Sequence, residues 1–268
     1  MRHTLPKNPQ FYVTAPQDCP YLDNQVERKL FTALYGVNSR RLNNSLSKQG
    51  FRRSQNVLYR PSCANCSACM SARISSRQFK PSKSQKRILS KNSDIVRVVN
   101  PALATDAQYN LFKKYITARH PNGGMSDMDA DDFTAMIEET NVESKLIEYY
   151  AKKNGELELI SFSLVDILDD GISMVYSVFN PDFKDRSLGT YMILDHNTLT
   201  LDMDRQYVYL GYWVQGSSKM DYKKRFSPLE VFTEDKWICS TKVGPTRPDN
   251  VNGSKEKLGL PIYLPSDQ

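Results

Sequence analysis

Acidic residues are missing from one long stretch of this 268-residue chain. Between Glu27 and Asp94 there is no aspartate or glutamate, while 15 lysines and arginines fall there. Residues 1–100 hold 18 basic and 4 acidic side chains, whereas residues 101–268 hold 18 and 26, so the net charge of +6 conceals a strong asymmetry. Ordinary solvated surfaces mix both signs of charge. The acid-free stretch therefore predicts a surface for a polyanion such as a nucleic acid.

Long apolar runs and histidines are scarce as well. No stretch approaches the roughly 20 apolar residues that a membrane-spanning helix needs, and the first residues lack the apolar segment of a signal peptide. We therefore expect a cytoplasmic protein without a membrane partner. The chain has three histidines and no local signature of a serine or cysteine hydrolase, which argues against a nucleophilic triad.

Cysteines number five, and four of them form a pattern. Cys63, Cys66 and Cys69 give the spacing C-x2-C-x2-C, Cys19 is the candidate fourth partner, and Cys239 stands apart. In a reducing compartment such clustering favours a thiolate metal site over disulfides. The spacing suits an iron–sulfur cluster, four thiolates suit zinc equally, and four free thiols are the alternative.

Three arginines flank the cysteine motif within the basic stretch. Arg52, Arg53 and Arg60 are candidates for contacts to nucleic-acid phosphates. Their positive charge would also favour the deprotonated form of nearby thiols.

Hydrophobic periodicity predicts an α+β protein with two domains. The first, residues 1–85, is small, basic and cysteine-containing, with one helix expected over 22–35, and the second covers residues 86–268. Residues 77–91 are expected to form an exposed connection or a basic helix. For the second domain we expect two helices between 105 and 140, strands at 144–151, 157–168 and 172–179, a helix over 187–203, strands at 207–212 and 231–240, and an irregular tail from residue 243.

The turn Asp185–Tyr191 has the pattern R-x-x-G-x-Y and opens a predicted helix. Backbone N–H groups at such a helix start attract phosphate, which makes Arg186 and Gly189 candidate ligands of an acyl donor. The turn resembles the coenzyme A site of N-acetyltransferases, and the order of elements is similar, so we expect an acetyltransferase-like (GNAT-type) mixed sheet with helices. Tyr191 stands where those enzymes have a small residue. The adenosine end of a tRNA is an alternative occupant.

Several segments between about residues 10 and 240 together resemble the bacterial aspartate/glutamate leucyltransferases, which are relatives of the eukaryotic arginyl-tRNA–protein transferases. The matching segments are Asp18–Leu22, Phe51–Gln55, Tyr59–Cys69, Arg119–His120, Gly123–Met125, Tyr176–Pro181, Arg186–Gly189, Tyr209–Val214, Lys219–Met220 and Tyr222–Lys223.

The resemblance implies an enzyme that transfers an amino acid, leucine in this branch, from aminoacyl-tRNA to proteins beginning with Asp or Glu. Such transfer marks the acceptor for degradation by the N-end rule pathway. Aminoacyl-tRNA is already an activated ester, so the chemistry needs no cofactor. A neutral α-amine, with a reference pKa of about 7.7–8.0, can attack it directly.

The substrate-binding candidates fall into two groups. An acceptor carboxylate calls for cations or donors, and an aminoacyl group or terminal adenine calls for aromatic side chains. The first group is Arg119, His120, Lys219 and Lys223, and the second is Tyr209, Tyr212 and Trp213. Arg52, Arg53, Arg60, Arg186 and Gly189 are the candidates for tRNA.

The sequence does not identify the catalytic groups, and three other functions are alternatives. These are arginyl transfer by the same mechanism, a coenzyme A-dependent N-acetyltransferase, and a non-enzymatic metal-containing RNA-binding module.

Overall fold

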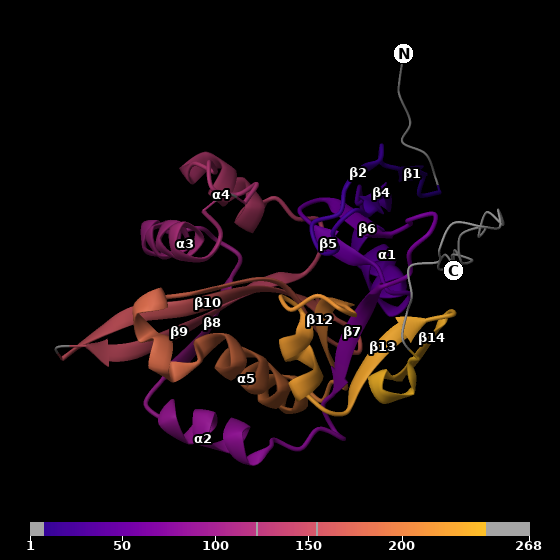
Figure 1. Cartoon of the computed structure of the whole chain (residues 1–268). Helices are drawn as coiled ribbons and strands as arrows, with labels where there is room; N and C mark the ends of the chain where they lie inside the picture. Colours follow the sequence, from indigo (N-terminus) through magenta and orange to yellow (C-terminus); the bar gives the residue numbers. More distant parts are fainter. Residues whose placement is uncertain (1–7, 122, 154, 245–268) are drawn as a thin grey trace. The chain divides into compact units, whose positions relative to one another are not determined.

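The computed structural model describes residues 8–121, 123–153 and 155–244, which form two compact units (Figure 1). Unit 2 is Ile74–Tyr209, and unit 1 holds the residues before and after it. The sequence predicted a single boundary at 85/86. The structure instead returns the last strands to unit 1, because β13 (Leu229–Thr233) neighbours β7 (Cys69–Ser75) in a sheet. Most of the irregular tail predicted from residue 243 lies outside the described residues.

Unit 1 is built mainly of antiparallel strands. One sheet has the order β1-β4-β6-β5, a short pair joins β2 to β3, and β13 pairs with β14. Helix α1 and the short helices η2 and η3 complete the unit. The bounds are β1 Phe11–Val13, β2 Gln17–Asp18, β3 Val26–Glu27, β4 Lys29–Ala33, α1 Ser39–Lys48, β5 Arg52–Ser54, β6 Val57–Pro61, β14 Lys236–Cys239, η2 Asp221–Arg225 and η3 Ser240–Lys242.

The helix predicted over residues 22–35 is wrong, because that segment forms β3 and β4. Its apolar residues imitate a helical stripe, but the fully buried Thr32 and Leu34 follow the two-residue period of a strand. The single strand expected at 231–240 is also wrong. It is a hairpin that turns at Glu234 and Asp235, both of which have positive φ.

Unit 2 places a mixed sheet between helices. Its strands run in the order β12-β11-β10-β9-β8, with antiparallel pairs except for the parallel pair β11–β12. Helices α3 and α4 cover one face, and α5 and α2 cover the other (Figure 1). The bounds are α2 Lys83–Lys91, β8 Val96–Pro101, α3 Asp106–Arg119, α4 Ala130–Glu138, β9 Ser144–Lys153, β10 Glu156–Leu168, β11 Gly171–Phe179, η1 Pro181–Arg186, α5 Leu188–Asp202 and β12 Tyr207–Val214. Strand β12 crosses the boundary, since its residues from Leu210 on belong to unit 1.

The helices and strands predicted between residues 105 and 212 are confirmed. Successive side chains of a strand point to opposite faces, and in unit 2 both faces are buried. Leu146 packs with α3 and α4, whereas its neighbour Ile147 packs with α5. The basic segment 77–91 contains helix α2, while α1 and strands β5–β8 carried no signal that we recognised.

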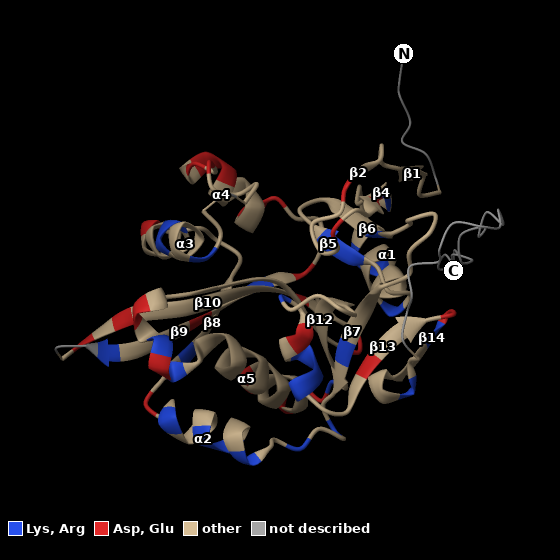
Figure 2. Cartoon of the chain, in the orientation of Figure 1, with Lys and Arg blue, Asp and Glu red and all other residues tan. Residues whose placement is uncertain are grey.

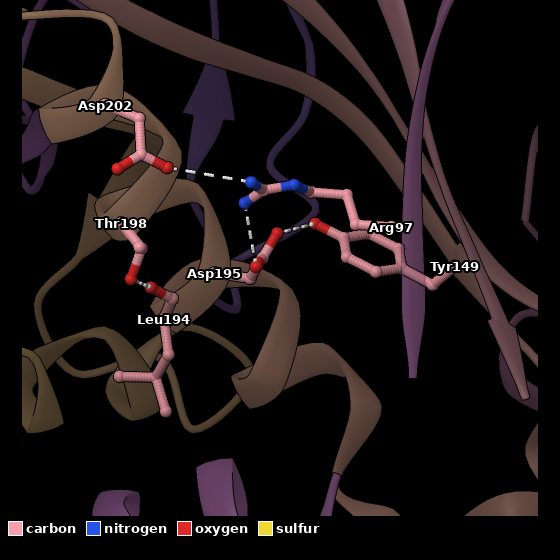
Figure 3. A network of polar contacts seen from close by, with 6 residues as sticks. All are labelled: Arg97, Tyr149, Leu194, Asp195, Thr198 and Asp202. Atoms are coloured by element: carbon pink, nitrogen blue, oxygen red, sulfur yellow. Dashed lines mark hydrogen bonds and ion pairs between the residues drawn. The ribbon is translucent and has the colours of Figure 1, made fainter. Parts of the chain in front are cut away.

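A polar network fastens α5 to the sheet (Figure 3). Asp195 on α5 accepts hydrogen bonds from Arg97 on β8, at 2.9 Å, and from the hydroxyl of Tyr149 on β9, at 2.8 Å. Arg97 also reaches Asp202 at 3.6 Å. Burial raises the pKa of Asp195, and Arg97 opposes that rise. The network thus holds α5 against β8 and β9.

No helix in the described ranges is long and apolar enough to cross a membrane.

Candidate functional site

Three segments of unit 2 meet around Phe179, the last residue of β11. The guanidinium carbon of Arg119 lies 5.8 Å from the centre of the Phe179 ring, and the Tyr115 ring meets it edge-on at 4.9 Å. A Cβ on Gly189 would lie 3.4 Å from the Phe179 ring, so the first turn of α5 touches the same residue. This grouping, the Phe179 cluster, unites the sequence candidates Arg119 and Gly189.

Arg119 is the exposed cation of the Phe179 cluster. It is the last residue of α3, and His120 is the C-cap, also exposed, with its ring 5.7 Å from Tyr115. Among the residues that the structure describes, no carboxylate forms an ion pair with Arg119. Its guanidinium is therefore available to an anionic ligand from solution.

In contrast to Arg119, the arginine of the turn before α5, Arg186, is paired with a carboxylate. Arg186 makes a two-pronged ion pair with Asp94, at 2.8 and 2.9 Å, and this bond lowers the pKa of Asp94. Asn92 donates to the Arg186 carbonyl at 2.9 Å, and Ser187 adopts a left-handed conformation without capping α5 through its side chain. A phosphate at Arg186 would have to share it with Asp94. At the start of α5, Thr190 and Tyr191 donate their N–H groups to the Ser187 carbonyl, so the N–H groups of Leu188 and Gly189 are the ones that could donate to an anion.

A second grouping, the Arg52 cluster, forms in unit 1. Gly211 has φ +77°, and a Cβ there would fall 0.8 Å from an Arg52 nitrogen, so only glycine lets the guanidinium lie against this backbone. The guanidinium sits 5.9 Å from the Tyr212 ring centre. The Tyr212 hydroxyl donates to the carbonyl of Tyr59 at 2.8 Å and lies 3.2 Å from that of Gly50. The structure thus brings Arg52 and Tyr212, from separate predicted groups, together.

Lys223 completes the Arg52 cluster from η2. Its side chain is buried, and its Nζ donates to the Tyr212 carbonyl. Burial, followed by the charge of Arg52, lowers the pKa of Lys223 to about 7. Lys223 is therefore bound within the protein and is a weaker candidate for an acceptor carboxylate than Arg119.

The remaining substrate candidates lie apart. Tyr209 belongs to unit 2, where its hydroxyl donates to Asp170 at 3.0 Å beside the β10–β11 turn. Trp213 in unit 1 is 1% exposed, and its Nε1 has no hydrogen-bond partner among the described residues. Lys219 is exposed in the turn after β12.

Arg53 and Arg60 are buried rather than displayed. Arg53 donates to the Gln55 carbonyl at 2.8 Å, and the Arg60 guanidinium lies 4.9 Å from the centre of the Phe51 ring. Their positions support the first β-sheet.

The four patterned cysteines lie in unit 1, where each is partly buried and none of them forms a disulfide. The pKa of Cys69 is raised to about 12, first by burial and then by the nearby Cys66, Cys19 and Cys63. Burial raises the pKa of Cys63 too. The expectation that the arginines lower these thiol pKa values is wrong for Cys63 and Cys69, because desolvation dominates. No group of three or more His, Cys, Asp or Glu within the described ranges is arranged to hold a metal ion.

Phe179 and Tyr115 are the contact residues that sequence reasoning missed. Both are partly buried aromatics in apolar patterns, which are typical of core residues. The only available signal was the presence of Phe179 in a segment resembling a known family.

Two family models match this chain. Residues 17–87 match the family model for the N terminus of arginine-tRNA-protein transferase, and residues 107–233 match the model for its C terminus. These matches define the class as an aminoacyltransferase that uses tRNA and protein.

Curated relatives extend the match over most of the chain. The aspartate/glutamate leucyltransferase of Dinoroseobacter shibae is 51% identical over 100% of this chain and 99% of its own. The enzyme of that name from Ruegeria pomeroyi is 57% identical over 90% and 88%. The chain therefore belongs to the arginine-tRNA-protein transferase family.

A solved structure is a distant neighbour. The C-terminal domain (DUF2156) of an Agrobacterium fabrum protein described as a lysylphosphatidylglycerol synthetase gives a TM-score of 0.42 at 10% identity, over 59% of this chain and 50% of that one. The resemblance is too distant to bear on function.

Proposed function

We propose that this chain transfers leucine from leucyl-tRNA to the N-terminal amine of proteins beginning with Asp or Glu, marking them in the cytoplasm for degradation. The names of the relatives support this donor and these acceptors. The structural feature that best supports an acidic acceptor is Arg119, an exposed guanidinium without a carboxylate partner among the described residues.

The proposed reaction is a direct aminolysis. The acceptor nitrogen attacks the ester carbonyl carbon, a C–N bond forms, and the bond from that carbon to the terminal ribose oxygen of the tRNA breaks. One proton passes from the amine to the departing oxygen, so atoms and electrons balance without a cofactor. Because the ester is activated and part of the amine is neutral near pH 7, holding the two groups together supplies much of the rate.

The Phe179 cluster is the proposed place of substrate binding in unit 2. Arg119 would pair with the acceptor carboxylate, and the N-terminal turn of α5, with Gly189 against Phe179, would meet phosphate at the end of the tRNA. Helices on both faces of a mixed sheet, and a helix starting beside the end of β11, support the acetyltransferase-like fold as part of this proposal.

We also propose that Cys19, Cys63, Cys66 and Cys69 bind a metal ion or an iron–sulfur cluster that stabilises the fold. Their spacing in the sequence, C-x2-C-x2-C with Cys19 further back, supports this proposal, whereas the described residues are not arranged to hold a metal ion. Elemental analysis of anaerobically purified protein, with Cys66→Ser as control, should find iron or zinc only in the unmodified chain. Absence of both from the unmodified chain would exclude the site.

The deciding assay offers labelled leucine and, in parallel, labelled arginine on purified charged tRNA to peptides beginning with Asp, Glu or Ala. We expect leucine to appear on the Asp and Glu peptides only. Arginine alone would move the chain to the arginyl branch. Transfer from acetyl-coenzyme A alone would make it an acetyltransferase.

Arg119→Glu tests the acceptor site. We expect at least about a tenfold rise in KM for the Asp peptide and little change in KM for leucyl-tRNA, with Arg119→Lys in between. Lys152→Glu, on the exposed surface of β9, makes the same charge change as a control. An unchanged Asp-peptide KM in Arg119→Glu would remove Arg119 from the site.

A further inference from the structure

Helix α2 divides into two faces. Gln85 and Asn92 are buried, and Ile88 and Leu89 pack against the core under α5, so the positions 85, 88, 89 and 92 form the inner face. The cations Lys83, Lys86, Arg87 and Lys91 occupy positions i, i+3, i+4 and i+8 on the opposite side, and all are exposed. We call these four residues the basic face of α2.

The basic face lacks neutralising partners. Within the described ranges no carboxylate pairs with any of its four cations, whereas nearby Arg77 pairs with Asp204 at 2.6 Å and Arg186 pairs with Asp94. Figure 2 shows Lys and Arg along α2 with no Asp or Glu on the helix. Unpaired cations gathered on one side of a helix favour a polyanionic ligand over a balanced solvated surface.

The position of α2 connects this face to the proposed donor site. Asn92, directly after α2, donates to the carbonyl of Arg186, so the C-terminal end of α2 adjoins the turn that opens α5. From Lys91 to Lys83 the helix runs back over about 12 Å. A ligand with phosphate at the α5 turn and further phosphates beyond it would meet these cations in succession.

We propose that the basic face of α2 docks the phosphate backbone of the tRNA, next to the site that receives its aminoacyl end. The proposal rests on the proposed function in taking charged tRNA as the donor. The contacts are electrostatic, so they strengthen the binding of any charged tRNA without reading its sequence.

The test is the full chain carrying Lys83→Gln, Lys86→Gln and Arg87→Gln together, because glutamine keeps the helix propensity of these positions. We expect KM for leucyl-tRNA to rise at least about tenfold at low salt, with kcat and the peptide KM unchanged. The slope of log affinity for uncharged tRNA against log salt should shrink by about 2 to 3. Changing Lys83 and Lys86 to Arg and Arg87 to Lys should preserve wild-type behaviour and a folded α2.

A matched control removes three exposed lysines elsewhere, with Lys152→Gln, Lys236→Gln and Lys242→Gln. An equal rise in KM in this control, or no rise in the α2 variant, would overturn the proposal. Loss of binding to anionic phospholipid vesicles with tRNA affinity unchanged would assign the face to a lipid surface and overturn it as well. Direct tRNA binding reports on the face even if no transfer is found, so failure of the proposed function is distinguishable.

Discussion

At the scale of single residues, the contact between Gly211 and the Arg52 guanidinium requires a glycine at position 211. Gly211→Ala would place a Cβ on the Arg52 guanidinium and would also strain a backbone with φ +77°. We expect a loss of more than about 3 kcal/mol of unfolding free energy, because steric overlap adds to the strain of roughly 1 kcal/mol or more. Urea unfolding of the variant and the wild type measures this loss of unfolding free energy.

Gly216 supplies the control for this prediction. It has φ +86° but nothing within 4 Å of its would-be Cβ, so Gly216→Ala should show the backbone strain alone, of about 1 kcal/mol. Arg52→Ala combined with Gly211→Ala should recover the part due to overlap. Equal losses for the two glycine variants would show that Arg52 does not lie against Gly211.

Lys223 should make stability depend on pH in a defined window. Its folded pKa of about 7 lies below the unfolded 10.5, so the unfolded chain holds more protons between these values and stability rises with pH there. Relative to Lys223→Met, the wild type should gain roughly 2 kcal/mol from pH 7 to pH 9. Parallel unfolding free energies for the two proteins across this range would contradict the burial of Lys223.

At the scale of elements, α5 carries a histidine that affects stability in the same direction as Lys223 but at lower pH. His196 is fully buried, and neither ring nitrogen has a partner among the described residues. Burial first, and Arg97 second, lowers its pKa to about 3, below the ordinary 6.5. Its neutral form therefore stabilises the fold above pH 6.5, and that stability is lost as pH falls.

His196→Leu should remove this dependence. Between pH 7 and pH 4 the wild type should lose roughly 3 kcal/mol more unfolding free energy than the variant, measured by urea unfolding at each pH. The leucine also avoids burying unpaired nitrogens, so the variant should be at least as stable at pH 7. A variant that loses as much stability in acid as the wild type would place His196 in contact with solvent.

Elements were predictable where local periodicity and tertiary packing agree. The stripe Leu111, Phe112 and Ile116 predicts α3 because those residues are the ones buried against the sheet. The helix predicted over residues 22–35 was wrong because the apolar residues of this segment also fit a helical spacing. Pairing of β4 with β1 and β6 makes the segment a strand instead. The meeting of Arg119 with Phe179 and Gly189 joins the end of α3 to a part of the chain far along the sequence, so no local pattern could show it.

At the scale of the whole molecule, folding buries some of the cations that the sequence counts, so not all of them can contact a polyanion. Of the 15 cations between Glu27 and Asp94, Arg53, Arg60 and Arg73 are buried, and Arg73 pairs with Glu230 at 2.7 Å. The exposed ones lie in both units, and they include the cations of α1 in unit 1 and the basic face of α2 in unit 2. Composition predicted a polyanion surface, but only the structure separates the cations that can contact one from those that support the fold.

Ionic strength should therefore affect the two substrates very differently. Each phosphate contact contributes about 0.7 to 0.9 to the slope of log affinity against log salt, so exposed cations acting together should raise KM for charged tRNA by roughly tenfold or more between 50 and 200 mM KCl. An acceptor held mainly by one charge pair, at Arg119, should change severalfold at most over the same range. Steady-state transfer with either substrate saturating separates the two values. Equal salt responses would mean that the basic surface does not bind the tRNA backbone, because a single ion pair and a row of phosphate contacts release different numbers of counterions.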